Sequence, residues 1–341
     1  MDFAPIISIL MPCHNAAETL DEALDSLQAQ TFRDYELVAV NDGSTDNTPE
    51  ILRQRTARDD RLCILSIPHG GIVAALNAGL KACRGKLVAR MDADDRSHPQ
   101  RLEKQYASLQ AHPEVAVLGC QVRAFPDGQV RPGFQVYIDW QNNLLSDEAM
   151  RRELFVESPL AHPSIMIRRS WLERLEGYQD HGWAEDYDLW MRLYLAGATF
   201  AKLPDALLDW RESPERLTRR DGRYSLENFL RLKAFYLQRG PLAGRESVII
   251  WGAGMVGRRL CKQLQRQGVP LVAFIDIDPR KIGQQRRGVP ILPPEELLPL
   301  WKRLPKPAVL AAVGARGARA IVRSRLNGFG LCEGRDWWGA A

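Results

Sequence analysis

Short apolar runs alternate with more polar segments over the first hundred residues of the chain. Four of these runs are typical of buried strands, at residues 6–11, 36–40, 62–67 and 86–91. The segments between them indicate helices at residues 17–28, 46–55 and 70–83; in the first, Leu20, Leu24 and Leu27 share one face. Strand and helix alternating through short connections predict a mostly parallel sheet with helices on both faces.

The middle of the chain has a less regular pattern. Apolar runs at residues 115–118 and 164–167 predict strands, and residues 185–196 and 226–236 have the spacing of helices. A Gly- and Pro-rich break follows at residues 239–244, which is typical of a domain boundary. We therefore expect two domains, residues 1–240 and residues 246–341.

A glycine-rich turn stands near the start of the second predicted domain. Gly252, Gly254 and Gly257 follow a predicted strand and precede a predicted helix, and Asp276 ends the next strand. This is the context of a dinucleotide fingerprint, in which backbone amides face phosphate and the acidic residue faces ribose hydroxyls. NAD(P) or another nucleotide is the candidate ligand, and the alternative is a Rossmann-like module that binds nothing. No catalytic His, Lys or Tyr constellation is evident there, so binding, regulation or assembly is favoured over hydride transfer.

Composition narrows the class of protein. The chain has 341 residues, 45% of them hydrophobic and 26% charged, as in globular proteins. Its net charge of +4 is too small to indicate a nucleic-acid binder. From residue 246 onward 16 Lys and Arg stand against 7 Asp and Glu, so that part carries +9 and the remainder −5. Two domains with different surroundings fit this asymmetry.

The cysteines and the apolar runs bear on localisation. Six scattered cysteines without a C-x-x-C spacing argue against both a zinc site and a disulfide framework. The first residues do not resemble a signal peptide, and no apolar run approaches the roughly 18 residues of a membrane span. We expect a cytoplasmic protein. The basic stretch at residues 216–239 leaves peripheral contact with the inner face of the membrane as an alternative to an ordinary solvated helix.

Polar clusters follow three of the predicted strands, at residues 12–15, 41–43 and 92–95. Ligands of such sheets bind at the carboxyl ends of the strands, where these clusters would meet. Asp92, Asp94 and Asp95 repel one another unless a cation lies among them, and oxygen ligands of this kind suit Mg²⁺ or Mn²⁺ shared with substrate phosphates. The alternative is a solvated acidic turn that caps the following helix.

Two further carboxylates have both an ordinary and a functional interpretation. Asp42 precedes Gly43 and could be only a turn residue, but at the shared edge it could also accept hydrogen bonds from a nucleobase. Asp186 lies in the first turn of a predicted helix, where acidic residues often only complement the helix dipole. Transfer to an acceptor hydroxyl needs one positioned carboxylate as general base, and Asp186 is the candidate.

Taken in order, these segments resemble family-2 glycosyltransferases over about the first 215 residues. The motifs that carry the resemblance are ILMPCHN (9–15), QTF (30–32), ELVAVNDGSTD (36–46), ARMDADD (89–95), HPS (162–164) and EDYDLWMRL (185–193). The resemblance implies a GT-A type nucleotide-binding mixed sheet, followed here by a smaller Rossmann-like α/β domain. It also implies inverting, metal-dependent transfer from a nucleotide-diphosphate sugar.

Residue roles follow from the same resemblance. The family's first loop lines the nucleotide pocket at the positions of Pro12, His14, Asn15 and Glu18. The family's acidic base-binding residue, commonly a partner of uracil, falls on Asp42. Asp92 matches the position near ribose and metal, Asp94 the metal ligand, and Asp186 the catalytic base. One departure is Glu212, which stands where many members have His, so a donor or metal contact is not carried over to that position.

The function predicted from the sequence is therefore transfer of a sugar, favouring a UDP-sugar donor, to an acceptor hydroxyl in surface polysaccharide or lipid-linked glycan synthesis. Mn²⁺ or Mg²⁺ is the expected cofactor. The alternatives are an NAD(P)-binding sugar-modifying oxidoreductase and a non-catalytic sugar-nucleotide-binding protein. No nucleic-acid partner is expected.

Overall fold

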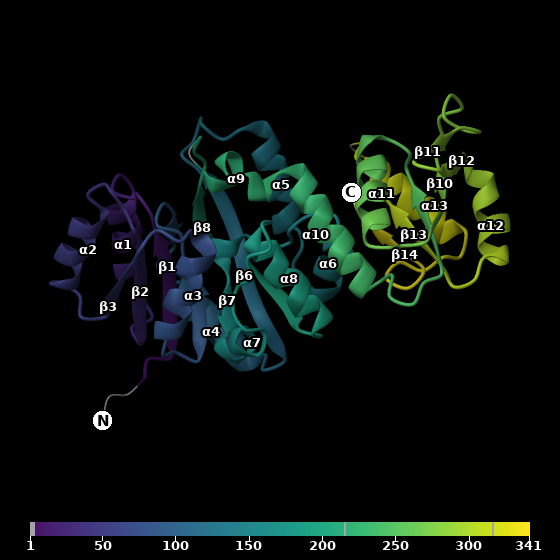
Figure 1. The fold of residues 1–341 in the computed structure, drawn as a ribbon. Helices are drawn as coiled ribbons and strands as arrows, with labels where there is room; N and C mark the ends of the chain where they lie inside the picture. The colour runs from purple at the N-terminus through teal and green to yellow at the C-terminus, as the bar shows by residue number, and fades with distance from the viewer. Residues whose placement is uncertain (1–3, 215, 316) are drawn as a thin grey trace. The chain divides into compact units, whose positions relative to one another are not determined.

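The computed structural model describes residues 4–214, 216–315 and 317–341, which form two compact units (Figure 1). The first unit comprises Met1–Met150, Pro159–His181 and Glu185–Arg220. The second comprises Arg151–Ser158, Gly182–Ala184 and Asp221–Ala341. The boundary predicted at residues 240–246 falls inside this second unit, after helix α10 (Leu226–Arg239).

The first unit is built on an eight-stranded mixed sheet with the order β3-β2-β1-β4-β7-β6-β8-β5 (Figure 1). Its strands are β1 (Ile7–Cys13), β2 (Tyr35–Asp42), β3 (Leu62–Ile67), β4 (Leu87–Arg90), β5 (Arg96–Ser97), β6 (Val115–Phe125), β7 (Met166–Arg168) and β8 (Thr199–Arg211). Strands β1 to β4 pair in parallel, as the alternation predicts. β7 then pairs antiparallel with both β4 and β6, which makes the whole sheet mixed rather than mostly parallel.

Helices cover both faces of this sheet. They are α1 (Leu20–Gln28), α2 (Thr48–Thr56), α3 (Ile72–Ala82), α4 (Arg101–Ala111), α5 (Pro132–Asn142), α7 (Arg169–Arg174), α8 (Glu185–Leu195), α9 (Leu217–Arg220) and the 3₁₀ turn η1 (His162–Ser164), while α6 (Asp147–Glu153) begins in the first unit and ends in the second. α1, α2 and α4 contribute leucines to one core, together with Ile7, Ile9 and Met11 of β1. Because side chains alternate along a strand, Leu10 points to the opposite face, where Gly79 lets α3 approach closely.

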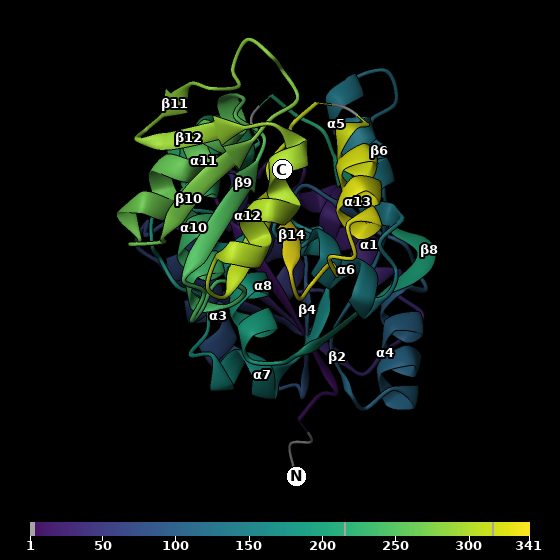
Figure 2. The same ribbon diagram turned by 90° about the vertical axis from the view of Figure 1, so that its right-hand side faces the viewer.

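The second unit has a six-stranded sheet with the order β11-β12-β10-β9-β13-β14 (Figure 2). Its strands are β9 (Ser247–Trp251), β10 (Leu271–Ile275), β11 (Gln285–Arg286), β12 (Val289–Leu292), β13 (Pro307–Ala311) and β14 (Trp337–Gly339). Its helices are α10, α11 (Met255–Arg266), α12 (Leu297–Arg303), α13 (Ala318–Gly328) and the 3₁₀ turns η2 (Gly222–Tyr224) and η3 (Pro294–Glu296). α12 and α13 share a core with Ile249 and Trp251 on one face of the sheet.

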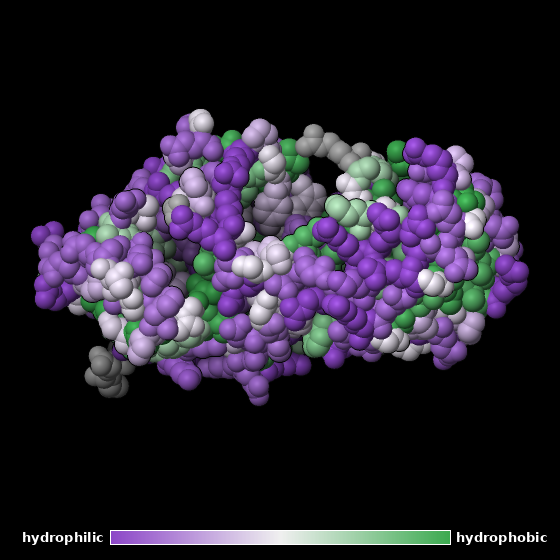
Figure 3. Space-filling model, turned by 45° about the horizontal axis from the view of Figure 1, so that its top comes forward, coloured by the Kyte–Doolittle hydropathy of each residue, from purple (hydrophilic) through white to green (hydrophobic). Residues whose placement is uncertain are grey.

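No helix in the described parts of the chain is long and apolar enough to cross a membrane. Figure 3 shows a face on which hydrophilic residues predominate in both units, with smaller hydrophobic areas among them.

Candidate active site at the carboxyl edge of the first sheet

Strand register brings the predicted site residues of the first unit to one edge. Cys13, at the end of β1, is paired with Asn41 near the end of β2, and Leu10 is paired with Arg90 at the end of β4. These strands are parallel, so the segments that leave them all emerge at the carboxyl edge of the sheet. The edge therefore collects His14, Asp42 and the acidic loop at residues 92–95, as the sequence predicts.

Asp42 organises the nearby loop that follows β3. Its buried carboxylate accepts hydrogen bonds from the backbone N–H groups of Gly70 (2.7 Å) and Gly71 (2.9 Å), and His69 Nδ1 lies 3.0 Å from Oδ2. His14 Nδ1 contacts the Asp42 carbonyl oxygen at 2.7 Å, and the two imidazoles stack with centroids 4.2 Å apart. A carboxylate has about four lone-pair directions, so these contacts leave capacity for a further donor.

The other residues predicted for the nucleotide pocket lie in different settings. Asn15, at a positive φ of 49°, ties two loops together: its backbone N–H donates to Ser44 Oγ at 3.0 Å, and its side-chain oxygen accepts from the N–H of Thr45 at 2.8 Å. Pro12 is buried within β1, opposite Val40. Glu18 is exposed just before α1. The strand β1 is thus longer than predicted, and Pro12 belongs to it rather than to the loop.

Asp92, Asp94 and Asp95 form a tight acidic cluster, with one oxygen of each within 4.8 Å of the others. Asp95 Oδ1 accepts the backbone N–H of Arg211 at 2.8 Å, whereas Oδ2 is buried without a hydrogen-bond partner in the described residues. Burial, and then the charge of Asp92, raise the pKa of Asp94 to about 6. Burial also raises the pKa of Asp95 well above its ordinary value. An orphaned carboxylate oxygen among crowded acids fits a divalent cation.

Arginines that the sequence reasoning missed surround this cluster. Arg90 is buried and forms an ion pair with Asp92, and its Nε has no acceptor within the described part of the chain. Arg211 donates from Nε to the Asp94 carbonyl oxygen at 2.5 Å. Arg90 stands two residues before Asp92, but Arg211 comes from a strand more than a hundred residues away. The sequence has no local signal for that second contact.

Asp186 is the second residue of α8, where its Oδ1 accepts the backbone N–H of Tyr187 at 2.7 Å. Burial raises the pKa of Asp186 to about 8, with the neighbouring Glu185 acting in the same direction and Arg90 opposing both. Arg90 therefore acts on Asp186 as well as on Asp92, so both carboxylates lie in the field of one buried guanidinium. Above about pH 8 the deprotonated carboxylate is a stronger base than an ordinary aspartate.

In the second unit, local packing explains the predicted fingerprint. A Cβ on Gly257 would lie 1.9 Å from the Gly252 carbonyl oxygen, so this glycine lets α11 approach β9. Gly252 itself has a φ of +118°, while Gly254 has open space around it. The carboxylate of Asp276 already accepts the Ala253 N–H at 2.8 Å and faces Lys281 Nζ at 3.2 Å. These contacts explain most of the motif without a ligand, and NAD(P) binding by this unit is not supported.

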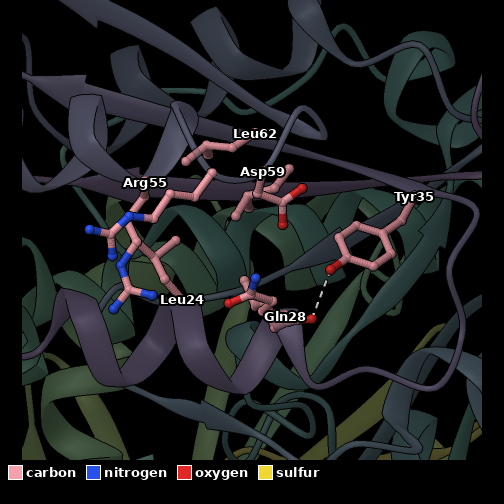
Figure 4. Close-up of a pocket in the computed structure, with 9 residues that line it drawn as sticks. Leu24, Gln28, Tyr35, Arg55, Asp59 and Leu62 are labelled. Atoms are coloured by element: carbon pink, nitrogen blue, oxygen red, sulfur yellow. Dashed lines mark hydrogen bonds between the residues drawn. The ribbon is translucent and has the colours of Figure 1, made fainter.

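A separate pocket opens at the opposite, amino edge of the first sheet (Figure 4). It is lined by Leu24 and Gln28 of α1, by Tyr35 and Leu62 at the starts of β2 and β3, and by Arg55. The Tyr35 hydroxyl donates to the Leu27 carbonyl oxygen at 2.8 Å across it. None of the predicted site residues lines this pocket, so it is distinct from the candidate active site.

Comparisons with known proteins show what this chain is similar to in sequence and in fold. The amylovoran biosynthesis glycosyltransferase AmsE of Erwinia amylovora is 31% identical over 246 residues, which cover 70% of this chain and 90% of that protein. The crystal structure of S. aureus TarS 1-349 in complex with UDP-GlcNAc matches with a TM-score of 0.56 at 21% identity, over 76% of this chain and 72% of that one. The mannosyltransferase PcManGT from Pyrobaculum calidifontis, in complex with GDP-Man and Mn²⁺, matches with a TM-score of 0.50 at 22% identity, over 69% and 63%.

Both solved structures are similar to this chain in fold, which confirms the expected GT-A type mixed sheet. A smaller sheet follows it in this chain, as expected. Residues 8–176, which run from the second residue of β1 to beyond β7, match glycosyl transferase family 2. Together with the relative that is 31% identical across nine-tenths of its length, this match means that the chain belongs to glycosyl transferase family 2 and is a glycosyltransferase.

Proposed function

We propose that the protein transfers a sugar from a nucleotide-diphosphate sugar to an acceptor hydroxyl with inversion of the anomeric configuration. The observation that supports this most is the acidic cluster, with the orphaned Asp95 oxygen, at the same sheet edge as Asp42. A nucleotide at Asp42 and a diphosphate at the cluster would together span this edge. Asp186, which lies in the field of the same Arg90, would be the proton acceptor of this site once it is deprotonated.

A divalent cation, Mn²⁺ or Mg²⁺, is part of the proposal. Asp94 would hold it, with Asp92 beside it near the donor ribose. Bound there, the cation would offset the negative charge that develops on the departing nucleoside diphosphate. The chemistry of the ligand set fits, because hard carboxylate oxygens are the groups these cations prefer. The complex of PcManGT with GDP-Man and Mn²⁺ gives a precedent in a protein of similar fold.

Asp186 would act as the general base. Its carboxylate would accept the proton of the acceptor hydroxyl while the hydroxyl oxygen bonds to the anomeric carbon and the bond to the diphosphate oxygen breaks. One base is enough because the nucleoside diphosphate is already a good leaving group. A single displacement of this kind inverts the configuration at the anomeric carbon.

For the donor we propose a UDP-sugar, with Asp42 accepting a hydrogen bond from the base. The remaining lone-pair capacity of its carboxylate supports this role. TarS was solved with UDP-GlcNAc, whereas PcManGT was solved with GDP-Man, so a guanine nucleotide is the competing choice. For the acceptor we propose a surface polysaccharide or lipid-linked glycan, since the AmsE relative is an amylovoran biosynthesis enzyme.

A donor screen tests this function. The full chain would be incubated with Mn²⁺ and each of a set of UDP-, GDP- and dTDP-sugars, and release of the nucleoside diphosphate measured with and without glycan acceptors. We expect release from at least one UDP-sugar that is lost on chelation with EDTA. Binding of donors without any release over a broad acceptor panel would favour a non-catalytic sugar-nucleotide-binding protein instead.

A further inference from the structure

Four residues next to the acidic cluster form an arginine–glutamate group: Arg211, Glu212, Arg216 and Arg219. We infer that Arg216 is a donor-binding residue that contacts the diphosphate, and that Glu212 holds it in position. The inference rests on the proposed function, because it assigns a ligand group to the same site. It gives a role to Glu212, whose position in the sequence departs from the family pattern.

Glu212 forms ion pairs with arginines and is not positioned to bind a metal ion. Its side chain is only 3% exposed, and its backbone N–H donates to the Phe125 carbonyl oxygen at 2.7 Å. One carboxylate oxygen forms a close ion pair with Arg219, and the other lies 3.8 Å from Arg216 Nη1. Neither group of clustered metal-ligating side chains found in the described residues includes it. That second oxygen, Oε2, has no hydrogen-bond partner in the described residues, so Glu212 binds Arg219 directly and acts on Arg216 through its charge.

Arg216 is held in a defined orientation. Its guanidinium lies over the rings of Trp210 and Phe134, 4.4 and 4.5 Å from their centroids. Nη1 donates to the carbonyl oxygen of Arg211 at 3.2 Å. The side chain is 10% exposed, so the protein does not fully enclose the guanidinium. Two aromatic faces and an acid therefore preorganise one cation.

Arg216 is also next to the acidic cluster. The peptide of Arg211 joins the two, since its N–H donates to Asp95 Oδ1 and the carbonyl oxygen of the same residue accepts from Arg216. In agreement with this, the charge of Arg216 lowers the pKa of both Asp94 and Asp95. A phosphate oxygen bound at the cluster would thus come within reach of the guanidinium fork, whose geometry matches phosphate.

The charges of the site fit this assignment better than a purely structural role. Three carboxylates of the cluster are already opposed by Arg90, Arg211 and Arg216. A divalent cation and a donor diphosphate bring opposite charges that offset each other, so the resident charges need not change on binding. Arg90 is buried and paired with Asp92, and Arg211 is engaged by the loop backbone, whereas the guanidinium of Arg216 is partly exposed beside the cluster.

Binding of nucleotides without metal isolates the contribution of Arg216. The full chain, its Arg216→Met and Arg216→Lys variants and an Arg174→Met control would be titrated with UDP and GDP in EDTA. Arg174 lies over the ring of Trp171 at 4.9 Å, so the control also removes a stacked arginine, but on α7. We expect Arg216→Met to weaken the better nucleoside diphosphate about tenfold, Arg216→Lys less, and the control not at all. Affinity for the parent nucleoside should not change.

The outcomes separate the inference from the proposed function. Unchanged affinity of Arg216→Met for the nucleoside diphosphate would overturn the role of Arg216 while leaving the glycosyl transfer proposal intact. Failure of the unaltered chain to bind UDP or GDP, with or without Mn²⁺, would overturn both. A melting temperature equal to that of the unaltered chain shows that a variant is folded. If Arg216→Met does not fold, the affinity of Arg216→Lys for the nucleoside diphosphate is compared with that of the unaltered chain instead.

Discussion

At the scale of single residues, Asp186 is the most direct test of the mechanism. Asp186→Asn keeps the shape of the side chain but removes the proton acceptor, so we expect transfer to fall by at least about a hundredfold. Donor binding should be preserved, because the proposed donor contacts lie on β1, β2 and the acidic loop. Nucleotide release and donor titration measure the two effects. Asp205→Asn changes a half-exposed carboxylate paired with Lys104 and serves as the control; equal turnover in both variants would remove Asp186 from the mechanism.

The pH dependence of transfer is a second residue-scale prediction. Burial raises the pKa of Asp186 to about 8, so below that pH the carboxyl is protonated and cannot accept a proton. Turnover should therefore rise as pH increases through about 8. The folded state also keeps this proton to higher pH than the unfolded state does, so its effect on stability is unfavourable as pH rises from about 4 to 8. Asp186→Asn should gain stability relative to the unaltered chain over that range, as melting temperatures at several pH values would show.

Asp94 tests the metal part of the proposal. Asp94→Ala removes the expected ligand, so we expect Mn²⁺ affinity and Mn²⁺-dependent donor binding each to fall at least about tenfold. Calorimetric titration with Mn²⁺, alone and with UDP or GDP, measures both. Asp127→Ala, at an exposed acid after β6, is a control that should bind as the unaltered chain does. Full metal-dependent donor binding by Asp94→Ala would contradict the assignment.

The sequence identifies the acidic residues of this site better than it identifies the arginines. Asp42 and Asp92 follow predicted strands, and the rule that parallel strands end at one edge places them together without a structure. Arg211 ends a strand that no pattern predicted and Arg216 follows that strand, so their positions beside the acidic loop depend on tertiary folding. The carboxylate of Asp42 also accepts hydrogen bonds from the backbone of the loop after β3, and no sequence pattern indicates these bonds.

At the scale of elements, regular alternation made the first half of the large sheet predictable. The strand predicted at residues 62–67 coincides with β3, and the others in that half differ by one or two residues at their ends. β8 escaped prediction because its buried and partly exposed residues do not alternate cleanly along its length. β7 was placed at residues 164–167, but its antiparallel pairing has no signature in so short a run.

Packing of α3 on the sheet gives a prediction at this scale. A Cβ on Gly79 would lie 2.3 Å from Leu10 Cδ1 and 2.7 Å from Val40 Cγ2, so the helix must move away. We expect Gly79→Ala to lower the free energy of unfolding by about 1–3 kcal/mol, although alanine favours helices. Gly133→Ala in α5, where nothing lies within 4 Å of the added Cβ, should instead be neutral or stabilising. Urea unfolding of both variants decides whether close approach is the reason for glycine at position 79.

At the scale of the whole molecule, the second unit draws on a distant part of the sequence. Residues 151–158 belong to it, although they lie between segments of the first unit. Within this unit Glu153 is 5% exposed and accepts hydrogen bonds from Arg319 (2.9 Å) and Arg323 (2.7 Å) of α13. No local pattern foretells these contacts, because the partners are more than 160 residues apart. The C-terminal segment predicted as a domain therefore lacks Glu153, although Arg323 keeps a second acidic partner there in Glu333.

This arrangement predicts how the second unit responds to substitution. Glu153→Gln leaves two arginines, Arg319 and Arg323, without their shared negative charge, and we expect the unit to lose about 1–3 kcal/mol of unfolding free energy. Glu295→Gln breaks an ion pair with Arg325, which lies on α13 like Arg319 and Arg323. Because Glu295 is 72% exposed, the loss of unfolding free energy should stay below about 1 kcal/mol. Thermal unfolding of the full chain at low and high salt compares the two. Salt screens buried ion pairs less than exposed ones, so the loss of stability caused by Glu295→Gln should vanish at high salt while that caused by Glu153→Gln should remain. If both losses vanished equally, the ion pairs of Glu153 would not stabilise the second unit as we expect.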